Sequence, residues 1–158
     1  MWGVVGYRGA KWETRPVLLG ESTQKLDAKN RVTLPARFRD HFGDGVVLTK
    51  GFDRCLFVFN KDDWGRFTES QLARLDPFSR KGRQLSRFLY GGAWETELDR
   101  QGRVMLPAMH LEHAGLERDI VVAGVRDRLE IWNVDAWRAQ EADSEGSVED
   151  VAEYLSQQ

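Results

Sequence analysis

The sequence predicts an α+β protein, mainly β, in which two copies of one unit are joined by connecting helices. Three observations predict this class. The segment 26–38 (LDAKNRVTLPARF) returns at 98–110 (LDRQGRVMLPAMH), with seven of 13 positions identical. In and after each copy, short runs of alternating or continuous apolar residues are typical of strands. Between the copies, apolar residues recur at the spacing of helices.

Each copy begins with an extended segment that enters a tight turn, at 28–30 in the first copy and at 100–102 in the second. The last turn residue must adopt a positive φ, which Gly102 does freely and which Asn30 tolerates best among other residues. An aspartate before each turn, Asp27 or Asp99, is expected to accept backbone N–H groups of the turn. A strand follows at once, over 31–34 in the first copy.

In the rest of each unit, prolines and glycines predict where the short helix begins and ends. Pro35 and Pro107 suit the first position of a short helix in each copy, and Gly43 and Gly115 suit its end. Two further strands follow in each copy, over 46–49 and 55–59, and then over 120–123 and 129–132.

Helices are predicted over 62–75, over 77–90 and in the tail. Asp62 is the expected cap of the first helix, and Ser147 with Asp150 resembles a capping box that begins a helix in the tail. Amphipathic packing explains the apolar stripes, which are Trp64, Phe67 and Leu75, then Phe78, Leu85 and Leu89, and finally Val148, Val151 and Leu155.

We divide the 158 residues into an N-terminal extension (1–20), a first repeat (21–67), a helical connector (68–92), a second repeat (93–137) and an acidic C-terminal helix or tail (138–158). The chain is 41% hydrophobic and 30% charged, which excludes a membrane protein and a mostly disordered chain. The first 20 residues lack an unbroken apolar stretch, so we expect no signal peptide and a cytoplasmic protein.

Residues suited to catalysis or metal binding are few. Cys55, the only cysteine, lies in the apolar run CLFVF and is expected to be a buried thiol. His110 and His113 are three apart on a helix, but no cysteine or carboxylate cluster accompanies them, so packing or surface roles are favoured over a metal. Phosphate-loop, nucleophile-elbow and HExxH motifs are absent from the sequence. We therefore expect no enzyme, metal or cofactor.

The net charge of −2 conceals a segregation of charge. Residues 25–103 carry 16 Lys and Arg against 11 Asp and Glu, whereas residues 138–158 carry one Arg against six acidic residues. Two loops with exposed cations are what a phosphate-contacting surface requires. The candidate DNA-binding residues are Lys29, Arg31, Arg100 and Arg103, with a secondary basic patch of Arg80, Lys81, Arg83 and Arg87 on the second connecting helix.

The duplicated D-x-x-[GN]-R turn, followed by hydrophobic–x–hydrophobic–P, resembles the MraZ family of bacterial transcriptional regulators, with tandem SpoVT-AbrB-type DNA-binding repeats. The resemblance runs from Gly20 to Trp137 and includes GGAWETELDRQGRVMLP. It implies a double-split β-barrel of two pseudo-symmetric units, assembled as a ring-shaped homo-oligomer. It also implies a nucleoid-associated repressor that binds direct repeats of double-stranded DNA in the promoter of the cell-division and cell-wall gene cluster. The motif arginines are Arg31 and Arg103.

Two departures from the family pattern stand out, Asn30 in place of the usual glycine and residues 1–19 ahead of the usual start. Two other functions remain open from the residues alone. One is a ring-forming scaffold that does not bind DNA, and the other is an enzyme that holds a small anion in a cleft between the repeats. The acidic tail either packs on a neighbouring chain or limits non-specific DNA binding.

Overall fold

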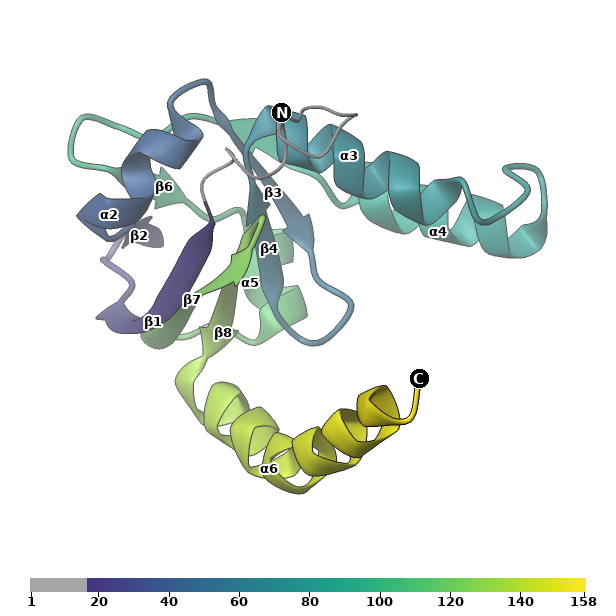
Figure 1. Cartoon of the computed structure of the whole chain (residues 1–158). Helices are drawn as coiled ribbons and strands as arrows, with labels where there is room; N and C mark the ends of the chain where they lie inside the picture. Colours follow the sequence, from purple (N-terminus) through teal and green to yellow (C-terminus); the bar gives the residue numbers. More distant parts are fainter. Residues whose placement is uncertain (1–16) are drawn as a thin grey trace, which may run out of the picture.

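The computed structural model describes residues 17–158 and confirms the α+β class, with strands and helices from both repeats (Figure 1). The strands are β1 (Leu18–Lys25), β2 (Arg31–Thr33), β3 (Val46–Lys50), β4 (Leu56–Phe59), β5 (Trp94–Thr96), β6 (Arg103–Met105), β7 (Asp119–Arg126) and β8 (Leu129–Asn133). The helices are α2 (Ala36–Arg39) with a 3₁₀ turn at Asp40–Phe42, α3 (Lys61–Leu72), α4 (Arg80–Gly91), α5 (Ala108–Ala114) and α6 (Val134–Ser156).

The two repeats are interleaved in one antiparallel sheet. Its strand order is β1-β7-β8-β4-β3-β5, while β2 and β6 form a separate two-stranded sheet. The order is pseudo-symmetric, because β1 of the first repeat pairs with β7 of the second, and β5 of the second pairs with β3 of the first. In residues 17–158, β1 and β5 end the larger sheet without pairing with each other, so the hydrogen bonding does not close a barrel.

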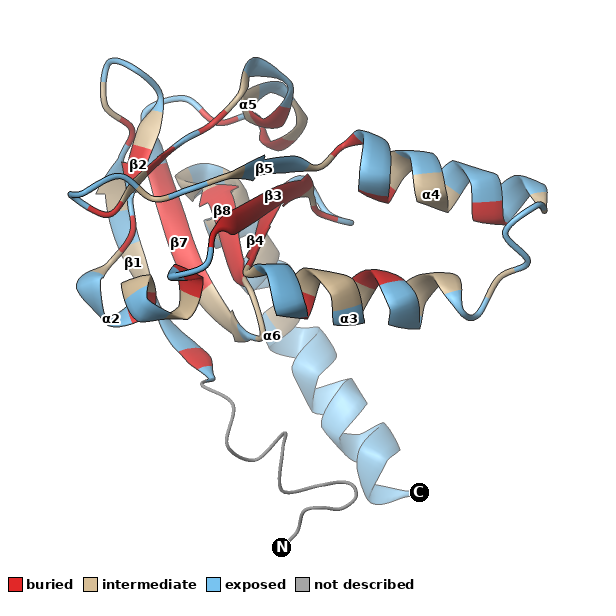
Figure 2. Cartoon of the chain, turned by 90° about the horizontal axis from the view of Figure 1, so that it is seen from above, coloured by how far each residue is buried: buried red, intermediate tan, exposed pale blue. Residues whose placement is uncertain are grey.

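One apolar core fills the space between the repeats. It contains equivalent residues of both copies, Val32 with Val104 and Leu34 with Leu106, all 2% exposed or less. Figure 2 shows the buried residues concentrated on the central strands β3, β4, β7 and β8. Core side chains therefore fill the centre of the boundary between the repeats, while an open hollow of about 490 Å³ remains at its surface, lined by Lys50, Arg54, Met109, Glu112 and His113.

A second cluster packs around the only cysteine. Cys55 is fully buried beside Phe57, Phe59 and Trp132, with Trp64, Phe67 and Trp137 of α3 and α6 packed against them. Burial in these apolar surroundings raises the pKa of the Cys55 thiol well above its ordinary value. The prediction of a core thiol is confirmed.

The connecting helices differ slightly from the predicted ones. Asn60, not Asp62, caps α3, since its side chain accepts the backbone N–H of Asp63 at 2.8 Å. The second helix begins after Ser79, whose hydroxyl accepts the N–H of Gly82, rather than at Pro77. Figure 1 shows α3 and α4 as a hairpin that projects away from the sheets.

The prolines lie one residue before the positions predicted for them. Pro35 and Pro107 are extended, with ψ of 140° and 157°, and they precede the first helical residues of α2 and α5. The prediction for the end of the second short helix is confirmed, because Gly115 adopts a left-handed φ of 58° after α5.

The tail does not contain a new helix that begins at a capping box. Helix α6 is continuous from the end of β8, and Asn133 caps it by accepting the backbone N–H groups of Asp135 and Ala136. Ser147 lies within this helix and donates its hydroxyl to the carbonyl of Asp143. No helix in the described part of the chain is long and apolar enough to cross a membrane.

Candidate nucleic-acid interface

The first D-x-x-[GN]-R turn is held by a single carboxylate. Asp27 Oδ1 accepts the backbone N–H of Lys29 at 2.8 Å and of Arg31 at 2.9 Å, and its Oδ2 accepts Arg31 Nε at 2.7 Å. Asn30 N–H donates to the carbonyl of Asp27, and Asn30 has a φ of 58°. The predicted positive φ and the predicted role of Asp27 are both confirmed.

The second turn repeats this arrangement nearly atom for atom. Asp99 Oδ1 accepts the N–H groups of Gln101 and Arg103 at 2.9 Å each, and Oδ2 accepts Arg103 Nε at 2.7 Å. Gly102 has a φ of 76°. The two loops are thus presented in the same conformation, as their shared sequence predicts.

Each aspartate is strongly biased towards its ionised form. The N–H of Arg31 and then its guanidinium lower the pKa of Asp27 to about 2, and Arg103 acts in the same order to lower the pKa of Asp99. The carboxylates are therefore charged at neutral pH. Each turn then carries one negative and two positive side chains.

The four candidate cations divide into two kinds. Arg31 and Arg103 have about a quarter of their side-chain surface exposed and each uses Nε on its aspartate. Lys29 and Arg100 are exposed and form no ion pair within residues 17–158. The first pair is therefore needed to shape the turns, whereas the second pair points charge into solvent without supporting the fold.

The two loops lie at opposite ends of the β2–β6 ladder. Leu106 N donates to the carbonyl of Asn30, and Leu34 N donates to the carbonyl of Gly102, both at 2.9 Å. Asn30 and Gly102 are therefore separated by four residues of strand, which corresponds to about 13 Å at the usual rise per residue.

Helix α2 adds two arginines that the sequence did not single out. Arg39 Nε donates to the carbonyl of Leu34 at 2.9 Å, and its guanidinium lies so close to Gly102 that a Cβ there would be 2.2 Å from Arg39 Nε. Arg37 stacks over the ring of Phe38, with its Cζ 4.4 Å from the centroid. The available signal was a difference between the copies, because the equivalent residues of the second repeat are Met109 and Leu111.

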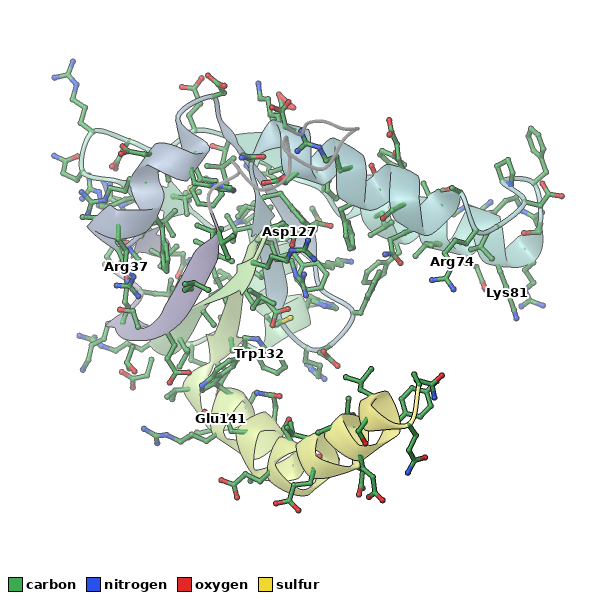
Figure 3. All side chains as sticks on the ribbon, viewed as in Figure 1. Arg37, Arg74, Lys81, Asp127, Trp132 and Glu141 are labelled. Carbon is green, nitrogen blue, oxygen red and sulfur yellow. The ribbon has the colours of Figure 1, made fainter. Side chains whose placement is uncertain are left out.

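The secondary basic patch does not join the loops. All four of its residues are exposed on α4, at the far end of the helical hairpin from β2, β6 and α2. Figure 3 shows Lys81 of this patch beside Arg74 at the tip of the hairpin, with Arg37 at the opposite end of the molecule. One short surface of a single chain cannot present both groups of cations.

The two histidines of α5, His110 and His113, have packing roles. His110 is fully buried and donates Nε2–H to the carbonyl of Gly92 at 2.8 Å, while His113 Nε2 lies 3.1 Å from the carbonyl of Gly51. Burial lowers the pKa of His110, which keeps its ring neutral. Among the described residues, no group of three or more His, Cys, Asp or Glu side chains could hold a metal ion.

Comparisons with known proteins agree with the repeat. The family model described as "MraZ protein, putative antitoxin-like" matches residues 17–88 and again 89–158. A protein of Thermoanaerobacter pseudethanolicus is 40% identical over 141 residues, covering 89% of this chain and 98% of its own length. Proteins of Syntrophomonas wolfei and Heliobacterium modesticaldum are each 42% identical over 140 residues, with 88% of this chain and 96% of theirs covered. All three are named "Transcriptional regulator MraZ".

Proposed function

The chain belongs to the MraZ family, and from this premise we propose that it is a transcriptional regulator that binds promoter DNA through its two D-x-x-[GN]-R loops. The observation that carries the proposal is the pair of equivalent loops, each locked by one aspartate and each presenting an exposed cation, Lys29 or Arg100. The names of the relatives support regulation of transcription.

The spacing of the loops suits double-stranded DNA. Their separation of about 13 Å is close to the width of the major groove of B-DNA, roughly 12 Å. Two loops at this distance can contact the phosphates on both sides of one groove. Within residues 17–158 the guanidinium of Arg31 donates only through Nε, to Asp27, whereas that of Arg103 also donates Nη2 to Gln101 Oε1 at 3.3 Å. A guanidinium with free terminal nitrogens in this position suits a bidentate contact to guanine.

One chain offers only a few contacts to DNA, and this bears on how the chain assembles and acts. A single pair of loops offers little affinity, so a ring-shaped homo-oligomer on direct repeats gains avidity through effective concentration. We propose that the chain acts as a repressor by occupying such repeats at the promoter of the cell-division and cell-wall gene cluster, in the cytoplasm and at the nucleoid. It performs no chemistry, in keeping with the regulator names of its relatives.

The test is a titration of the DNA directly upstream of the gene, by fluorescence anisotropy across a salt series. The variant Lys29→Ala/Arg100→Ala removes two exposed cations without touching the hydrogen bonds of the turns. Exposed charged contacts contribute up to about 1 kcal/mol each, so binding should weaken roughly 10-fold. The slope of log affinity against log salt should fall by about 0.9 for each lost phosphate contact.

The matched control is Arg54→Ala/Arg138→Ala, which removes two exposed cations from the β3–β4 turn and from the start of α6. It should keep the affinity and the salt slope of the wild type, because neither segment lies at the β2–β6 end of the molecule. Equal losses in both variants would mean that general charge, not the loops, governs binding. A wild-type chain that forms rings but binds no upstream DNA would favour the scaffold instead.

A further inference from the structure

The distal half of α6 carries an uncovered apolar stripe. Val148, Val151 and Leu155 are 61%, 56% and 64% exposed, and their spacing of three and four residues places them on one face of the helix. Trp137 lies on the same face near the start of α6, where it packs against Trp132 with ring centroids 5.7 Å apart. The stripe thus continues a face that packs on the sheet, but beyond the edge of the sheet (Figures 1 and 2).

Charge restricts what can cover this stripe. Residues 138–158 carry six acidic side chains and one Arg. Pairing α6 with α6 of a second copy would bring two acidic helices together, and like charges at such a seam are destabilising. The complementary surface should therefore combine apolar side chains with cations.

A groove with this chemistry lies between α3 and the β7–β8 turn. It has a volume of about 590 Å³, a floor of Phe57 and Phe67, and a rim of Arg66, Arg126 and Arg128. Phe52 also lines it and is 53% exposed, although its ring lies 5.8 Å from the rings of both Phe57 and Phe67. We refer to these six residues as the Phe52 groove.

The three arginines of the Phe52 groove have three acidic neighbours, but only two of the arginines pair with them. Arg66 pairs with Asp63, and Arg128 pairs with Asp127 and Glu130. Arg126 is exposed, has a positive φ of 69° and forms no ion pair in the described part of the chain. An apolar and acidic helix would cover the exposed phenylalanine and neutralise this side chain at the same time.

We propose that the apolar stripe of α6 docks in the Phe52 groove of a second copy of this chain. The inference rests on the ring assembly in the proposed function and specifies its contact. The two surfaces are different parts of the molecule, so the contact is heterologous, and repetition of a heterologous contact generates a ring when the rotation closes. The acidic tail then packs on a neighbouring chain and leaves the loops free for DNA.

Cysteine cross-linking tests which surfaces meet. Ser70 lines the groove and Val151 lies in the stripe, so Ser70→Cys and Val151→Cys are co-expressed on chains with tags of different size and oxidised. Native Cys55 is fully buried and does not compete. We expect a mixed Ser70→Cys/Val151→Cys dimer. Disulfides that form only between two Val151→Cys chains would overturn the proposal. So would a chain carrying both substitutions that forms its disulfide only within itself.

Light scattering on the full chain tests whether the contact builds the assembly. Val151→Asp and Arg126→Glu should each lower the molar mass to less than half of the wild-type value. The control Gly146→Asp places a carboxylate on the opposite face of α6 and should keep the wild-type mass.

The same measurements separate this contact from the proposed function. If the wild type binds upstream DNA as an oligomer and Val151→Asp keeps its mass, the docking proposal fails while the proposed function stands. If Arg126→Glu loses DNA affinity without losing mass, the groove contacts DNA and the docking proposal fails as well. If the wild type is monomeric and still binds DNA, both the ring and the docking proposal fail.

Discussion

Gly102 and Asn30 occupy equivalent positions in the two loops, yet the structure predicts very different costs for replacing them by alanine. Both have positive φ values, 76° and 58°, which an alanine adopts at a cost of roughly 1 kcal/mol or more. Gly102 also has a steric constraint, because a Cβ there would be 2.2 Å from Arg39 Nε and 2.6 Å from Arg39 Cδ. Arg39 would have to move and would lose its hydrogen bond to the carbonyl of Leu34.

The expected magnitudes follow from these two terms. Gly102→Ala combines the left-handed backbone cost with a lost hydrogen bond of about 1 kcal/mol, so the free energy of unfolding should fall by about 2–3 kcal/mol. Asn30→Ala should cost about 1 kcal/mol or less, because asparagine itself adopts a positive φ only with some strain. For a domain of this size the melting temperatures should fall by roughly 4–12 °C and by up to roughly 4 °C, respectively.

Thermal and urea unfolding followed by circular dichroism, at one fixed chain concentration, measures both variants. The double variant Gly102→Ala/Arg39→Ala isolates the contact, since the clash is gone and the hydrogen bond is already lost. Its cost should be about 1 kcal/mol less than the sum of the two single costs. If Gly102→Ala is no more damaging than Asn30→Ala, or if the double variant is simply additive, Arg39 does not constrain this loop.

Three further predictions concern titration and burial. The pKa of Asp27 is lowered from 3.8 to about 2, so its ionised form stabilises the fold above pH 3.8 and this contribution is lost as the pH falls towards 2. The urea midpoint of Asp27→Asn should therefore depend less on pH between 3.8 and 2 than that of the wild type. An unchanged pH dependence would contradict the assignment. Because burial lowers the pKa of His110 from 6.5, the unfolded chain binds this proton better, and the free energy of unfolding should fall as the pH drops below 6.5. His110→Gln keeps a donor for the carbonyl of Gly92 and should remove this decline. The control His113→Gln should retain it. Cys55 should react with a thiol reagent only along the urea unfolding curve, and rapid labelling of the folded protein would show that the cluster around it opens.

Local features of the fold could be predicted because they depend on neighbouring residues. The carboxylate of Asp27 reaches only the next four residues, so the spacing D-x-x-[GN]-R is enough to predict the turn and the positive φ of Asn30. The wrong prediction that a separate helix begins at Ser147 has an equally local origin. Ser147 and Asp150 fit a capping box, but Asn133 begins the helix earlier and the residues between 133 and 147 favour its continuation.

The candidate site was predictable only in part. The repeat located the four cations of the loops, whereas Arg39 could not be connected to Gly102 from the sequence, since 63 positions separate them and only the fold brings α2 against the second loop. In the same way, a basic pattern identified the patch on α4, but only the direction of the helical hairpin shows that this patch lies far from the loops (Figure 3).

By itself, the sequence determined that the protein has two equivalent units, each with a cationic turn held by an aspartate, because a duplication and a short-range hydrogen-bond pattern are both readable along the chain. The tertiary structure decided that these units are interleaved. Alternation of apolar residues specifies which face of a strand is buried, but it does not specify the partner strand. These pairings, β1 with β7, β5 with β3 and β2 with β6, therefore had to come from the folded chain. The first two unite the repeats around one core, and the third sets their loops at the two ends of the β2–β6 ladder.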